Sequence, residues 1–147
     1  MMGAAFNLQK HYHFLSLDLL IAGVLWHDIG KMIEINDVLA GGYSTTGKLL
    51  GHMSIGVSLL DQIAEEKGIE GEEIELLKHM VLSHHGKLEW GSPIRPRIPE
   101  AVALHFIDYQ DSFFYSLFRN IKDVEVGEWS KINILGEQHN FLKHSLS

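Results

Sequence analysis

Apolar and polar positions along this chain recur mostly with the period of an α-helix. The segment 18–28, DLLIAGVLWHD, is apolar on nearly every side, which is typical of a helix at the centre of a domain. Asp18 is suited to cap its N-terminus, and Gly30 is suited to end it. This pattern predicts a buried central helix whose last residues are a histidine and an aspartate.

Three further segments have helical character. Apolar residues recur near helical spacing in 48–68, whereas 70–86 opens with acidic residues and ends at a glycine. The segment 92–100 holds all three prolines, so we expect a loop that Pro99 turns into a helix over 99–120. The succession of helices predicts an all-α bundle.

Two segments lack a clear period. Residues 36–47 are rich in glycine and threonine, which indicates a loop. Residues 123–147 mix glycine, asparagine and short apolar stretches, which favours irregular structure, a short hairpin or one more helix. No repeat or linker interrupts the chain, and its length of 147 residues suits one domain. We therefore predict a single domain over 1–147 with an irregular tail from about residue 123.

Composition narrows the chemistry and the location. Cysteine is absent, so disulfides and thiolate ligands are excluded, and imidazole and oxygen ligands would have to bind any metal. The longest apolar run, 19–26, is much shorter than the roughly 20 residues that span a bilayer, and the first residues lack the features of a secretory signal. We therefore expect a cytoplasmic protein with no membrane partner. The net charge of −7 argues against tight non-specific binding of nucleic acid and favours a small substrate.

Ten histidines are the conspicuous excess, and several of them fall where predicted helices begin or end. Burial of a lone imidazole or carboxylate is costly unless the group finds a partner, and a shared metal would satisfy several at once. The residues that fit this pattern are His27, Asp28, His52, His84, His85 and Asp108. Their ligand types favour Mn²⁺, Fe²⁺, Ni²⁺ or Zn²⁺, with Mg²⁺ as an alternative. The sequence thus predicts a site for divalent metal ions.

Other histidines and acids have simpler interpretations. His105, beside Asp108 on the last helix, is expected either to support the metal ligands or to have a structural role. Asp111 has three open interpretations: support of the ligands, binding of substrate, or membership of a surface network. The remaining histidines are expected to pack or to lie on the surface, namely His11, His13, His79, His139 and His144.

Four blocks carry a resemblance to a known family. Their order, His-Asp, then His, then His-His, then Asp, resembles the HD superfamily of metal-dependent phosphohydrolases. More narrowly, residues from about 18 to about 120 are similar to the C-terminal HD domain of bacterial 3′-5′ exoribonucleases of the CMP-binding-factor type, and the tail GEWSKINILGEQHNFLK resembles that group more loosely. The blocks are AGVLWHDIGK, YSTTGKLLGHMSIG, LSHHGKLEWGSP and PEAVALHFIDYQD.

The chain departs from the pattern of this family in two ways. The family has an additional histidine on a first helix, roughly thirty positions ahead of the His-Asp pair. Counting back from His27 falls before Met1, so we expect the first helix of the HD bundle to be truncated in this chain. Full-length members also carry an N-terminal OB-like domain for RNA, which these residues lack. The expected partners are therefore such an OB-like domain or a second copy of the chain.

The resemblance also implies how the ligands are divided. Asp28 would bridge two ions, His27 and Asp108 would complete the first, and the histidines at 52, 84 and 85 would bind the second. Consecutive helical residues point about 100° apart, so the spacing leaves open which of the paired histidines binds, and a turn of the chain at Gly86 would let both reach the metal. Two such ions would lower the pKa of a shared water and so generate a hydroxide that attacks phosphorus.

Two lysines and one acid complete the expected site. Lys31, just past Gly30, would contact the substrate phosphate and act with Asp28 as a catalytic residue, although an exposed lysine at a helix end is an equal alternative. Lys87 in the second Gly-Lys pair would bind substrate in the same way, and Asp111 is a further substrate-binding candidate.

The expected function is metal-dependent hydrolysis of a phosphodiester in RNA or in a nucleotide, with an RNA 3′ end or a nucleotide as substrate. One alternative is a phosphohydrolase of small nucleotides, which the acidic charge favours. Another is a non-catalytic regulatory module that binds nucleotide or metal and has lost the first histidine ligand.

Overall fold

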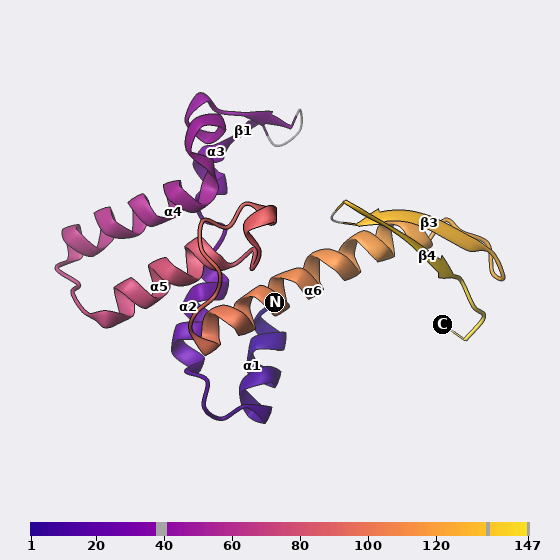
Figure 1. Ribbon diagram of the computed structural model, residues 1–147, viewed down its shortest axis with the longest axis horizontal. Coiled ribbons are helices and arrows are strands. Elements are labelled where there is room, and N and C mark those ends of the chain that lie inside the picture. Colours follow the sequence, from indigo (N-terminus) through magenta and orange to yellow (C-terminus); the bar gives the residue numbers. More distant parts are fainter. Residues whose placement is uncertain (38–40, 135, 147) are drawn as a thin grey trace. The chain divides into compact units, whose positions relative to one another are not determined.

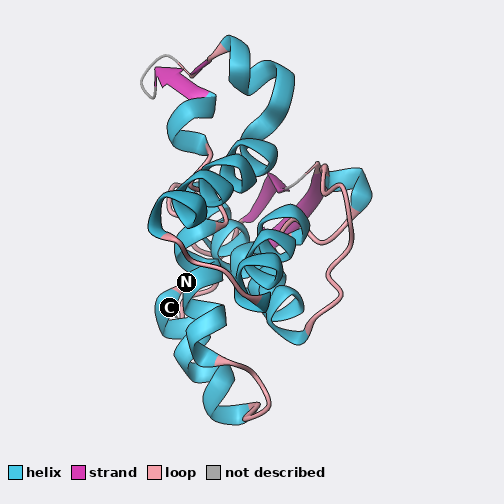
Figure 2. Cartoon of the chain, turned by 90° about the vertical axis from the view of Figure 1, so that its left-hand side faces the viewer, coloured by secondary structure: helices cyan, strands magenta, loops and turns pink. Residues whose placement is uncertain are grey.

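The computed structural model of the chain describes residues 1–37, 41–134 and 136–146. These residues form two compact units, Met1–Ile107 and Asp108–Ser147, and the helix α6 (Pro99–Ile121) runs through the boundary between them. Helices carry most of the described residues and strands are confined to short hairpins (Figure 2). The prediction of an all-α bundle is confirmed, whereas the prediction of one domain stays a prediction.

The first unit is built mainly from helices (Figure 1). Helices α4 and α5 lie side by side, and α2 packs against both α1 and α5. Within the described residues, no helix has an apolar stretch long enough to cross a membrane. The elements that precede α6 are α1 (Met2–His11), α2 (Leu17–Trp26), α3 (Lys31–Glu34), β1 (Ile35–Asp37), β2 (Gly42–Tyr43), α4 (Thr45–Lys67), α5 (Glu72–Ser83) and the short 3-10 helix η1 (Leu88–Trp90).

The ends of α2 differ from the sequence prediction. Its N-cap is Ser16, whose hydroxyl accepts a hydrogen bond from the backbone N–H of Leu19 at 3.4 Å, so the prediction of Asp18 as the cap was wrong. Asp18 lies in the first turn instead, where its negative charge interacts favourably with the helix dipole. The helix ends at Trp26, so His27 and Asp28 follow it directly.

Gly30 has a different role from the predicted helix stop. Its φ is −62° and it is the N-cap residue of α3, so it does not terminate α2 through a left-handed conformation. A Cβ atom at this position would collide with the backbone carbonyl of His52. Glycine is therefore needed here because α4 passes too close for any side chain, and this close approach brings His52 to the end of α2.

The core of the first unit lies where α2, α5 and α6 meet. Leu20, Met80 and Leu104 are fully buried there. A Cβ atom on Gly23 would collide with the end of the Met80 side chain, so α2 and α5 pack closely. Helix α2 is not surrounded on every side, since 66% of Leu25 is exposed. The tight contact sets the separation of the two helix ends that carry His27 and His84.

The loop predicted over 36–47 contains more structure than expected. Strands β1 and β2 pair antiparallel, and α4 begins before the predicted residue 48 because Ser44 caps it. The Ser44 hydroxyl accepts a hydrogen bond from the N–H of Gly47 at 2.8 Å. Residues 38–40 of this predicted loop lie outside the described residues.

The second unit contains the end of α6 and an antiparallel hairpin of β3 (Trp129–Ile134) and β4 (Glu137–Leu142). The hairpin is one of the alternatives that the sequence left open for 123–147. Ile132 and Ile134 are buried while Lys131 and Asn133 are exposed, as expected for a strand with one packed face. The ring of Phe113 on α6 contacts the rings of His139 and Phe141, with centroids 5.5 and 6.3 Å apart.

Candidate metal centre

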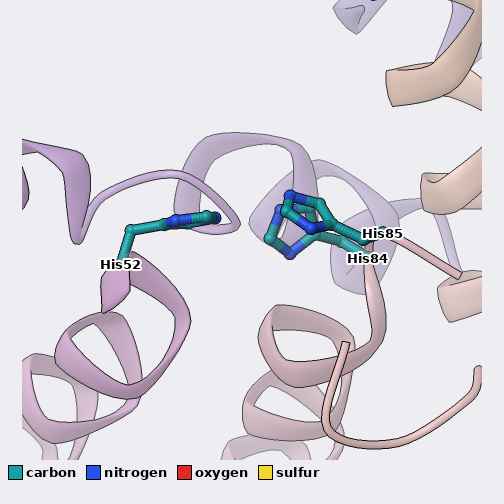
Figure 3. A group of neighbouring side chains, drawn as sticks. All are labelled: His52, His84 and His85. Carbon is teal, nitrogen blue, oxygen red and sulfur yellow. The ribbon is translucent and has the colours of Figure 1, made fainter. Parts of the chain in front are cut away.

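Three separate elements deliver the predicted ligands of the first unit to one place. His27 and Asp28 follow the end of α2, and His84 is the C-cap of α5 with His85 directly after it. His52 follows Gly51, whose φ of 69° and ψ of 156° interrupt α4. The imidazoles of His52, His84 and His85 point toward one another (Figure 3), and each offers a nitrogen within 4.8 Å of the others.

Asp28 lies among the imidazoles. Its Oδ1 is 3.6 Å from Nε2 of His52 and 3.8 Å from Nε2 of His84. Its Oδ2 is 3.4 Å from Nε2 of His27. One carboxylate thus faces three of the predicted histidine ligands, which is the position that a bridging ligand requires.

The histidines are fixed in the tautomer that suits a metal. Nδ1–H of His27 donates to the carbonyl of Val24 at 3.0 Å, and Nδ1–H of His84 donates to that of Val81 at 2.7 Å. Because a carbonyl only accepts, the neutral imidazole keeps its lone pair on Nε2. His85 is held in the same way, with Nδ1–H donating to the carbonyl of Trp90 at 2.7 Å.

His52 is oriented by a carboxylate that the sequence reasoning missed. Glu34, only 8% exposed at the end of α3, accepts hydrogen bonds from the backbone N–H of His52 at 3.0 Å and from its Nδ1–H at 3.4 Å. A carboxylate behind a ligand histidine fixes the ring and raises its basicity. The available signal was an acid near the Gly-Lys pair inside an otherwise apolar stretch, GKMIE.

Three buried polar atoms without a hydrogen-bond partner converge at this place: Asp28 Oδ1, His52 Nε2 and His84 Nε2. Leaving such atoms unpaired costs about 1–3 kcal/mol each. All three are electron-pair donors, so they cannot satisfy one another without a proton. A divalent cation would satisfy them together, and this donor set of imidazoles and a carboxylate therefore fits the predicted metal.

The protonation states fit the same cation. Burial lowers the pKa of His84 to about 3 and also lowers the pKa of His52, so both rings are neutral near pH 7. Burial alone would raise the pKa of Asp28, but the neighbouring His27 ring and the Lys31 ammonium outweigh burial and hold this pKa well below its ordinary value. The site therefore presents two neutral imidazoles, those of His52 and His84, and an ionised carboxylate.

The two predicted lysines lie in different surroundings. Lys31 donates to Asp28 Oδ2 at 2.8 Å, and its side chain remains 44% exposed at the rim of the site. Lys87 is exposed, and its ammonium lies 4.1 Å from the centroid of the Trp90 ring. Lys31 thus contacts the predicted bridging ligand, whereas Lys87 belongs to the loop that follows the paired histidines.

The predicted residues of α6 divide at the unit boundary. Nδ1–H of His105 donates to the carbonyl of His84 at 3.0 Å, so this histidine holds the end of α5, in keeping with a structural role. Asp108 and Asp111 belong to the second unit, and their roles stay predictions.

Comparisons with known proteins agree with this arrangement. The HD domain family matches residues 1–112. A "3′-5′ exoribonuclease YhaM" of Geobacillus sp. is 45% identical over 97% of the chain, which spans 44% of that relative. The protein of the same name in Bacillus subtilis is 41% identical over 97% of the chain, which spans 46% of it. The chain thus spans less than half the length of these curated relatives. No solved structure was found to match the chain significantly.

The fold and the site define a helical domain with a candidate histidine–aspartate metal centre. The chain belongs to the HD domain family, as its sequence predicts. Its similarity to exoribonucleases of the YhaM type confirms the narrower resemblance as well.

Proposed function

We propose that the chain is the catalytic part of a metal-dependent phosphodiesterase that cleaves RNA from its 3′ end. The observation that carries this proposal is the convergence of three buried electron-pair donors that have no hydrogen-bond partner, Asp28 Oδ1, His52 Nε2 and His84 Nε2. The name that the relatives carry supports the reaction class and the substrate class.

In this proposal His27, Asp28, His52, His84 and His85 would hold divalent ions, and Asp108 stays a predicted further ligand. When bound, Mn²⁺, Fe²⁺, Ni²⁺, Zn²⁺ or Mg²⁺ supplies Lewis acidity toward the phosphoryl group and lowers the pKa of a nearby water. The hydrogen bonds at Nδ1 of the histidines keep their Nε2 atoms directed into the site.

The charged side chains at the rim would position the substrate. The Lys31 ammonium, held by Asp28 at 2.8 Å and partly exposed, is placed to contact a phosphate oxygen that approaches the centre. The ammonium would also offset the negative charge that develops on the phosphoryl oxygens in the transition state. Lys87 and Asp111 are the further substrate-binding residues of the proposal.

A second candidate is a phosphohydrolase of small nucleotides. The net charge of −7 favours it, because a long RNA would be repelled by an acidic surface unless another domain supplies basic residues. Cleavage of a labelled oligoribonucleotide compared with release of phosphate from nucleoside monophosphates separates the two candidates.

The test pairs metal analysis of the purified chain with hydrolysis of bis-p-nitrophenyl phosphate in Mn²⁺, Ni²⁺ or Mg²⁺. Asp28→Ala should abolish hydrolysis while the helical circular dichroism is kept. Asp61→Ala, which removes an exposed carboxylate on α4 paired with Lys78, should leave activity unchanged. Hydrolysis that persists in Asp28→Ala contradicts the proposal. Stoichiometric metal without any turnover would instead support the regulatory module.

A further inference from the structure

A cleft of about 500 Å³ lies beside the candidate metal centre, on the loop between α5 and the proline-rich segment. Its lining differs from the rest of an acidic chain, because it holds two cationic side chains, one acid and an indole. The lining residues are Gly86, Lys87, Glu89, Trp90 and Arg95. All of them belong to the first compact unit.

The wall of the cleft is tied to the metal centre by direct hydrogen bonding. The carbonyl of Trp90 accepts the Nδ1–H of His85 at 2.7 Å, so the residue that lines the cleft also orients a predicted ligand. Gly86 lines the cleft and follows His85 in the chain. Its φ of 79° makes the turn that the paired histidines require. A molecule in this cleft therefore lies next to the histidine pair.

The side chains in the cleft match the parts of a nucleotide. Trp90 is half-buried, and the ammonium of Lys87 lies over its ring at 4.1 Å. A flexible lysine that covers a ring face can move aside for a base. The base then stacks on the ring, and the ammonium contacts a phosphate instead. Arg95 is exposed and offers a second cation for the phosphates, and Glu89 offers an acceptor for ribose hydroxyls or amino groups of a base.

We propose that this cleft binds a nucleotide at the end of single-stranded RNA, with its base on Trp90 and its flanking phosphates on Lys87 and Arg95. The inference deepens the proposed function and rests on it for the choice of RNA. An indole flanked by cations suits unpaired bases, which stack on aromatic rings without regard to sequence. The cleft would hold the RNA while its scissile phosphate lies at the metal centre.

The test measures binding of a 5′-fluorescein-labelled hexa-adenylate RNA to the chain in EDTA, by fluorescence anisotropy. Trp90→Leu should weaken binding by about 5- to 150-fold, the range expected for the loss of one stacked base. Trp90→Phe should restore most of the affinity, because phenylalanine also stacks. Since EDTA removes metal, the readout is independent of hydrolysis.

The cations are tested by salt dependence. Lys87→Ala and Arg95→Ala should each reduce the slope of log affinity against log salt by about 0.7, as expected for one phosphate contact with a single strand. The matched controls are Lys67→Ala at the end of α4 and Arg97→Ala, both exposed and outside the lining of the cleft, and both should bind as the parent does.

Two results would overturn the inference: unchanged affinity in folded Trp90→Leu, or equal losses in the cleft variants and in their controls. Each leaves the proposed function standing if bis-p-nitrophenyl phosphate is still hydrolysed in an Asp28-dependent way. Conversely, if the protein binds RNA in a Trp90-dependent way but hydrolyses nothing, the proposed activity is refuted while the proposal that the cleft binds RNA is supported.

Discussion

Removal of the Glu34 carboxylate tests whether this residue orients His52 for metal binding. In Glu34→Ala the buried backbone N–H of His52 loses its acceptor, which had been 3.0 Å away, and Nδ1 loses the carboxylate at 3.4 Å. An unpaired buried donor costs about 1–3 kcal/mol, so the urea midpoint should fall by on the order of 1 M. His52 would also become free to turn away from Asp28.

The second consequence is weaker binding of metal. Loss of a partner behind a ligand histidine typically costs 10–100-fold in affinity, or about 1.4–2.7 kcal/mol. Glu34→Gln should lose less stability, because its amide oxygen can still accept from the His52 N–H, yet it should bind metal more weakly than the parent. Glu65→Ala, an exposed acid on α4, is the matched control.

Isothermal titration of the metal-free variants with Ni²⁺ measures the affinities, and urea denaturation followed by circular dichroism measures the stabilities. If folded Glu34→Ala binds Ni²⁺ as tightly as the parent and as Glu65→Ala, the assignment of Glu34 as the residue that orients His52 is refuted.

Three other predictions follow from the same geometry. Gly30→Ala forces a Cβ against the carbonyl of His52, so it should destabilise the chain by about 1–3 kcal/mol in urea denaturation and weaken metal binding, and a neutral result would contradict the close approach. Chelation should lower the melting temperature because it leaves the buried donors unpaired, and calorimetry with and without EDTA checks this; identical melting curves would argue against bound metal. In metal-free buffer, stability should fall as pH drops from 6.5 toward 3, because burial lowers the pKa of His84 to about 3 and the unfolded chain takes up the proton first; denaturation at pH 7 and pH 4.5 measures the loss, and equal stabilities would contradict it.

The sequence predicted the parts of this site that depend on local pattern. The apolar run 18–28, the acidic start of 70–86 and Pro99 located α2, α5 and α6, and the paired histidines and the His-Asp pair stood near helix ends where the structure has them. His27, Asp28, His84 and His85 come together as expected, because these positions follow from where α2 and α5 stop. His52 joins them from the interruption of α4 at Gly51.

Contacts between segments that are distant in the sequence could not be predicted from the local pattern of residues. Glu34 contacts His52 across 18 positions, and Gly30 meets the His52 carbonyl because two backbones approach closely. The apolar neighbours of Glu34 hint that it is buried, but nothing local shows that its partner is His52 or that the backbone of α4 lies against Gly30. Trp90 was missed for a similar reason, since its carbonyl reaches His85 only after Gly86 turns the chain.

The cap of α2 shows a competition between neighbouring residues. Both Ser16 and Asp18 are good N-cap types, and the choice between them depends on where the chain leaves its extended conformation. That point is fixed in part by Glu100 on α6, whose carboxylate accepts a hydrogen bond from the N–H of Ser16 at 2.7 Å.

X-ray absorption at the zinc edge of the Zn²⁺-loaded chain tests the central claim most directly, because it reports the ligand atoms themselves. The account predicts imidazole nitrogens at about 2.0–2.1 Å, with at least one imidazole lost in His52→Ala. A shell of oxygen alone, or an unchanged spectrum in His52→Ala, would contradict the convergence of these histidines and Asp28 on a shared cation.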